Sequence, residues 1–205
     1  GHRSQVSRQL TAQLPQEKAV PVLWSLVQEF PDEPEYRRGL ARCLDESGQH
    51  DEAIGILGKL ATDFPNVYQV ELAELLRKRV GRYRDTDQVD KAIADLSEAI
   101  RLDPRNVDGY RSRADLYQAM GDFEKAVADF DKAIELKPEE WYLWCQRALA
   151  NIARARDDEY RTDCGEMLQR FGQTDEAQLV AWTCALAPDA ISDWSKAVAL
   201  AEKAD

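Results

Sequence analysis

Hydrophobic and polar positions along the chain form a series of amphipathic runs, and four of these runs end at a proline. The prolines are Pro31, Pro65, Pro104 and Pro138, so that successive ones lie 34, 39 and 34 residues apart. Proline stops a helix because it lacks the amide hydrogen and clashes with the preceding turn. The spacing therefore predicts helices that recur with a period of about 34 residues.

Apolar residues recur at fixed distances before each proline. An alanine stands twelve residues before it, and a larger apolar residue stands eight before it. These residues are Ala19, Ala53, Ala92 and Ala126 at the first place, and Leu23, Leu57, Leu96 and Phe130 at the second. Residues four apart share one face of a helix, and a small alanine lets a neighbouring helix approach closely. We expect this face to be buried.

A second amphipathic run precedes each of these helices, with Ala41 and Ala114 on its apolar face. Gly48 and Gly121 lie between the two runs, where glycine supplies the left-handed backbone of a short helix–helix turn. Each unit is a helix–turn–helix that buries its apolar face only by stacking on its neighbours. The sequence thus predicts an all-α fold, an α-α superhelix (solenoid) of about six stacked helix pairs.

The regular centre of the chain resembles a known repeat family. The run Tyr110, Ala114, Tyr117, Gly121, Ala126, Phe130, Ala133 and Pro138 closely resembles the tetratricopeptide repeat (TPR). Arg113 departs from this pattern, because a leucine is usual at its position. The resemblance extends to residues 34–67. It implies a protein-interaction scaffold that is not an enzyme and that binds a peptide or protein partner in a concave groove.

The period organises the chain into one predicted TPR-like superhelical domain over residues 4–205. Regular repeats are expected at 34–67, 68–106 and 107–140, and more degenerate helix pairs at 4–33, 141–173 and 174–205. Residues 1–3 are interpreted as the remnant of an expression tag. Segments 30–54 and 164–190 also resemble TPR regions of planctomycete-type bacterial proteins, which often carry a serine/threonine kinase domain. That resemblance implies a regulatory or docking segment of a larger protein, attached to an upstream kinase-type domain.

The longer interval of 39 residues predicts an insertion in the second regular repeat. If Ala73 is the counterpart of Ala41, seven residues are added between the two helices, near 77–88. This stretch contains the basic residues Arg77, Lys78, Arg79, Arg82 and Arg84. Insertions in repeat proteins often carry function, so one interpretation is docking of an acidic partner or an acidic sibling domain. The other is that these cations complement a helix C-terminus and keep the chain soluble.

The first helix of each pair lines the concave groove in the resembled family. Transferred by position, the groove of this chain would contain Arg38, Arg42, Asp45, Arg111, Asp115, Gln118, Tyr142 and Leu149. Arginine and aromatic side chains are frequent anchors for peptides. Each of these residues could equally be an ordinary solvated helix position. Chaperone-binding members hold a C-terminal carboxylate with a clamp of lysines and asparagines that this sequence lacks, so acidic chaperone tails are poor ligands.

Tryptophan and cysteine residues are expected mainly in the core. Trp144, Trp182 and Trp194 follow helical spacing and are interpreted as core residues, whereas Trp141 need not be buried. The four cysteines form no CxxC pair and lie in apolar helical stretches, at Cys43, Cys145, Cys164 and Cys184. They are predicted to be buried free thiols, which fits a cytoplasmic protein.

Charge and composition narrow the classes of partner and of site that the chain is expected to have. The net charge of −11 and a pI near 4.8 disfavour nucleic acid and anionic membranes as partners, since both require a basic face. His50 is the single histidine outside residues 1–3, and no pattern indicates a catalytic centre, a metal site or a cofactor. We therefore expect a scaffold that binds a protein or peptide ligand. The alternative is a structural spacer or self-association module without a peptide ligand.

Overall fold

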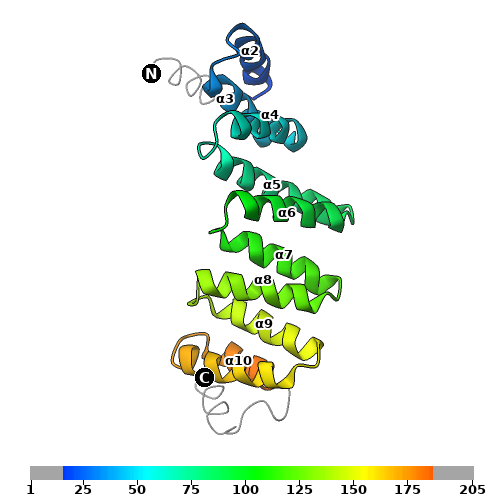
Figure 1. Cartoon of the computed structure of the whole chain (residues 1–205), viewed down its shortest axis with the longest axis vertical. Helices are drawn as coiled ribbons and strands as arrows, with labels where there is room; N and C mark the ends of the chain where they lie inside the picture. Colours follow the sequence, from blue (N-terminus) through cyan, green and yellow to red (C-terminus); the bar gives the residue numbers. More distant parts are fainter. Residues whose placement is uncertain (1–15, 187–205) are drawn as a thin grey trace. The chain divides into compact units, whose positions relative to one another are not determined.

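The computed structural model describes residues 16–186, and all regular elements among them are helices (Figure 1). The chain divides into two compact units, residues 1–104 (unit 1) and 105–205 (unit 2), and each is described by itself. The single superhelical domain over 4–205 stays a prediction. The first part of the helix pair predicted at 4–33 and the last part of the pair predicted at 174–205, which includes Trp194, lie outside the described residues. None of the described helices is long and apolar enough to cross a membrane.

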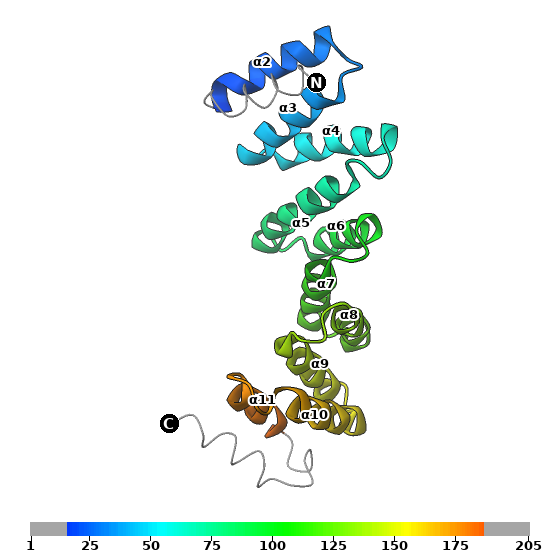
Figure 2. The same ribbon diagram turned by 90° about the vertical axis from the view of Figure 1, so that its left-hand side faces the viewer.

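Unit 1 contains five described helices, each of which packs on the next along the chain (Figure 2). They are α2 (Gln16–Glu29), α3 (Pro34–Glu46), α4 (His50–Asp63), α5 (Gln69–Asp85) and α6 (Val89–Leu102). Their shared core contains Leu23, Leu40 and Leu60, all of which are fully buried. The alanines predicted at the close helix contacts are also fully buried, as Ala19, Ala53 and Ala92 show.

Unit 2 continues the same pattern with α7 (Val107–Ala119), α8 (Phe123–Leu136), α9 (Trp141–Ala153), α10 (Asp157–Phe171) and α11 (Ala177–Cys184). Successive helices again pack together, and α11 also contacts α9. The core is built on Phe130, Leu143, Tyr160 and Met167, none of which is exposed. The sequence therefore predicted the helix pairs of both units over the described residues.

The turn inside each helix pair has the same backbone geometry in four successive repeats. One residue of each turn has a positive φ: Gly48 at 77°, Asp87 at 55°, Gly121 at 79° and Ala155 at 56°. The amide that follows each of these residues donates a hydrogen bond of 2.8–2.9 Å to a carbonyl five residues earlier, as Gln49 does to Leu44. This is the Schellman ending of a helix, which requires a left-handed residue. The turns therefore fix a common register for the four repeats.

This register corrects the predicted insertion at 77–88. Helices α3, α7 and α9 have 13 residues, whereas α5 has 17, and all four end two residues before the positive-φ residue. The additional residues of α5 therefore lie at its N-terminal end, within 68–72. The counterpart of Ala41 is Val80, which is buried and stands twelve residues before Ala92, and not Ala73. The basic residues 77–84 thus belong to the regular first helix of the repeat.

The degenerate repeat at 141–173 keeps its phase although a large residue replaces the small alanine. Tyr160 occupies the position of Ala126 and is fully buried. Its hydroxyl donates a hydrogen bond of 2.6 Å to the main-chain carbonyl of Thr183 in α11. The larger side chain thus reaches past the position of an alanine and links α10 to α11.

The tryptophans follow the core prediction only in part. Trp144 is buried, and its indole nitrogen donates a hydrogen bond of 3.0 Å to the carbonyl of Pro138. The core prediction is wrong for Trp182, which is 58% exposed. The buried face of α11 runs through Val180, Ala181 and Cys184, and Trp182 falls on the opposite side. All four cysteines are free and buried, as predicted.

Candidate functional site

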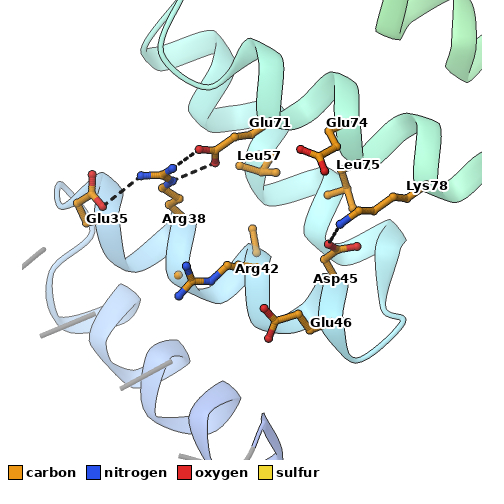
Figure 3. A pocket seen from close by; sticks show the side chains of 12 residues that line it. Glu35, Arg38, Arg42, Asp45, Glu46, Leu57, Glu71, Glu74, Leu75 and Lys78 are labelled. Carbon is orange, nitrogen blue, oxygen red and sulfur yellow. Dashed lines mark hydrogen bonds and ion pairs between the residues drawn. The ribbon is translucent and has the colours of Figure 1, made fainter. Parts of the chain in front are cut away.

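A groove with a volume of about 500 Å³ lies between the first helices of two successive repeats in unit 1 (Figure 3). Helices α3 and α5 form its walls, and Leu57 of α4 lies beneath them. The lining residues are Glu35, Arg38, Gly39, Ala41, Arg42, Asp45, Glu46, Leu57, Glu71, Glu74, Leu75 and Lys78. Arg38, Arg42 and Asp45, which were predicted for the groove, are thus brought together with four residues of α5.

One wall of the groove is joined to the other by a forked ion pair. The guanidinium of Arg38 in α3 donates to both carboxylate oxygens of Glu71 in α5, and the Nε–Oε2 distance is 3.0 Å. A carboxylate oxygen of Glu35 lies 3.9 Å from the same guanidinium. The hydrogen bond to Glu71 raises the pKa of Arg38 above its ordinary value. A planar fork of this kind fixes both side chains in orientation as well as in distance.

Asp45 forms the second link between the walls. Its carboxylate accepts a hydrogen bond of 2.7 Å from Nζ of Lys78 in α5 and lies 3.0 Å from Nδ1 of His50. The hydrogen bond to Asp45 raises the pKa of Lys78 above its ordinary value. Glu71 and Glu74 were not predicted for the groove, and Lys78 was predicted only as part of the basic insertion, because the 39-residue interval left the phase of α5 open. The positive-φ turn at Asp87 is the feature that gives the correct register.

Two of the other basic residues of α5 are held by acidic side chains of unit 1. Arg79 donates two hydrogen bonds, of 2.8 and 2.7 Å, to the carboxylate of Asp95 and a third, of 2.8 Å, to Asp51. Arg82 donates to the other oxygen of Asp51 at 2.6 Å. The hydrogen bond from Arg79 lowers the pKa of Asp51. These contacts bind α5 to α4 and α6, whereas Arg84 is exposed.

The candidate residues of unit 2 also lie on adjoining helices. Arg111 of α7 lies 3.2 Å from Asp108 and has its guanidinium carbon 5.7 Å from the ring centre of Tyr142 in α9. Gln118 donates a hydrogen bond of 3.3 Å to the carbonyl of Gln146 in α9. Asp115 and Leu149 are half-buried. Arg111, Gln118 and Tyr142 thus lie at the contact between α7 and α9.

An arginine–aspartate pair repeats along the chain, and the two partners are always 16 positions apart in the sequence. Arg79 pairs with Asp95, Arg113 with Asp129 and Arg147 with Asp163, at distances of 2.5–2.7 Å. The three arginines lie 34 residues apart, at the position where the resembled family usually has leucine. In the first regular repeat Leu40 and Ile56 occupy these two positions. The departure at Arg113 is therefore part of a repeated ion pair.

Comparisons with known proteins identify the family of the repeat. Family models described as "Tetratricopeptide repeat" match residues 17–78 and 107–140, and one described as "TPR repeat" matches 82–121. The chain contains tetratricopeptide repeats. A comparison with curated proteins finds no match.

Solved structures of similar TPR-type fold cover most of the chain. "Crystal structure of MamA protein" is 20% identical, covers 90% of this chain and 98% of its own, and has a TM-score of 0.57. "MamA AMB-1 P212121" is 20% identical, covers 87% and 94%, and has a TM-score of 0.57. "MamA 41-end from Desulfovibrio magneticus RS-1" is 16% identical, covers 85% and 98%, and has a TM-score of 0.55. At these identities the likeness shows the fold.

Proposed function

We propose that this chain is a protein–protein interaction scaffold and that the groove of unit 1 binds a segment of a partner polypeptide. The observation that carries the proposal is the convergence of Arg38, Arg42 and Asp45 with the wall formed by α5, around a volume of about 500 Å³. Tetratricopeptide repeats act as interaction scaffolds, and the groove lies on the helices that line the binding face in that family.

The lining of the groove suits an extended peptide with mixed side chains. Leu75 and Ala41 close the base of the groove, and charged groups follow both walls from Glu35 to Lys78. Charged groups around an apolar floor fix the register of a peptide, while the floor supplies contact area. Most binding energy in such an interface comes from a few anchoring residues, and arginine is frequent among them.

Reversing one charge in the groove tests the proposal. In Arg38→Glu the fork that joins α3 to α5 is replaced by two opposed carboxylates, so the two walls are no longer held together and the groove loses its shape for a peptide of any charge. We expect recovery of the partner in a pull-down to fall about tenfold or more. Lys59→Glu is the matched control, because Lys59 is exposed on α4 and does not line the groove. Circular dichroism confirms that both variants stay folded. Equal recovery by wild type and Arg38→Glu would count against the groove.

We also propose that the chain is a cytoplasmic docking segment of a bacterial protein with an upstream kinase-type domain. The support for this is the resemblance of 30–54 and 164–190 to planctomycete-type TPR regions. Reading the coding sequence upstream of residue 1 tests it. A kinase-type domain is the expected result, and an unrelated upstream sequence would contradict the proposal.

A further inference from the structure

The charged groups that line the groove of unit 1 are not balanced. Five of its twelve lining residues are acidic and three are basic, so the groove is negative, as is the chain as a whole with a net charge of −11. We infer that the groove selects peptides that carry lysine or arginine, an inference that rests on the proposed function. An acidic peptide would enter against a field of its own sign.

Two of the three basic residues already have carboxylates of the groove as partners. Glu71 accepts both arms of Arg38, and Asp45 accepts the ammonium of Lys78 at 2.7 Å. A carboxylate of a ligand would have to displace Glu71 or Asp45 to reach these cations. A lysine or arginine of a ligand meets no such competition, because a carboxylate with several lone pairs accepts from two donors at once.

Glu74 is the group best placed to receive a cation. It lies on α5 between Glu71 and Lys78, its side chain is exposed, and it has no hydrogen bond or ion pair among the described residues (Figure 3). Leu75, which is 3% exposed, and Leu57 lie beside it in the lining. The aliphatic stem of a lysine or arginine can lie along the wall of the groove while its charged end reaches a carboxylate.

Peptide selection tests the inference directly. Random peptides displayed on phage are selected against the full chain, and the enriched peptides are titrated as free, labelled peptides by fluorescence anisotropy. We expect enrichment of lysine and arginine beside aliphatic residues, and an affinity that falls as salt is added. Glu74→Lys should weaken binding about three- to tenfold. Glu52→Lys, with the same change of charge on exposed α4, should leave binding within about twofold.

The other outcomes separate the inference from the proposed function. Enriched acidic peptides that lose affinity in Arg38→Glu would overturn the preference for basic peptides and support a peptide-binding groove. Basic peptides that bind Glu74→Lys as tightly as wild type would overturn the assignment of this groove as their site. Selection that enriches no peptide over the bare support would contradict both the inference and the proposed function.

Discussion

At the scale of single residues, the turn inside each helix pair shows how backbone geometry constrains sequence. The left-handed position is glycine in two repeats, but Asp87 and Ala155 occupy it in the other two. A side chain with a Cβ costs roughly 1 kcal/mol or more in this conformation, and glycine does not. The glycines were recognisable in the sequence, whereas Asp87 and Ala155 gave no such signal. That difference explains why the register of α5 was misread.

Substitutions at two of these turns should have opposite effects on stability. A Cβ at Gly121 would meet no atom within 4 Å, so Gly121→Ala should cost only the conformational penalty, about 1 kcal/mol. Ala155→Gly should stabilise unit 2 by a similar amount, because φ there is already 56°. Urea denaturation followed by tryptophan fluorescence measures both. A loss of stability in Ala155→Gly would contradict the assigned geometry.

At the scale of helices, the repeated arginine–aspartate pair is a contact that the periodicity of the sequence did not predict. The 34-residue period located the helices because buried alanines and leucines recur on one face. It gave no reason for Arg113, since the partner Asp129 lies on the next helix and is recognised only once the helices are packed. The insertion at 68–72 was assigned to the wrong end of α5 for a related reason, because Ala73 and Val80 are both buried.

Removing one or both members of a pair should separate its two effects. Arg113→Leu leaves Asp129, which is 5% exposed, without its partner, and should destabilise unit 2 by about 3 kcal/mol. The double variant Arg113→Leu/Asp129→Ile copies the residues Leu40 and Ile56 of the first repeat. It should return to within about 1 kcal/mol of wild type. A double variant no more stable than Arg113→Leu, in the same urea titration, would show that the pair is not the cause.

The link from α10 to α11 can be tested with a single hydroxyl. Tyr160→Phe removes the 2.6 Å hydrogen bond to the carbonyl of Thr183 and should cost about 1–2 kcal/mol of unfolding free energy. Tyr117→Phe is the control, because its hydroxyl has no hydrogen bond among the described residues, and it should change stability by less than about 0.5 kcal/mol. Equal melting temperatures for the two variants would contradict a structural role for this bond.

At the scale of the whole molecule, buried and exposed acidic residues have different surroundings. Aspartates such as Asp95 and Asp163 are buried against arginines, while the groove of unit 1 keeps carboxylates at its surface. The net charge of −11 was plain in the sequence and indicated that nucleic acid is a poor partner. The lining of the groove could not be predicted from the sequence, because it depends on which residues of α5 face α3. The charge of the groove therefore depends on the register of α5 as well as on the net charge of the chain.

The position at which a peptide binds tests the central claim most directly. The full chain with labelled leucine methyl groups is titrated with a selected peptide and followed by nuclear magnetic resonance. We predict that the methyl signals of Leu57 and Leu75 shift on binding and that those of Leu143, in the core of unit 2, do not. Shifts confined to unit 2, or shifts that persist unchanged in Arg38→Glu, would contradict a binding groove between α3 and α5.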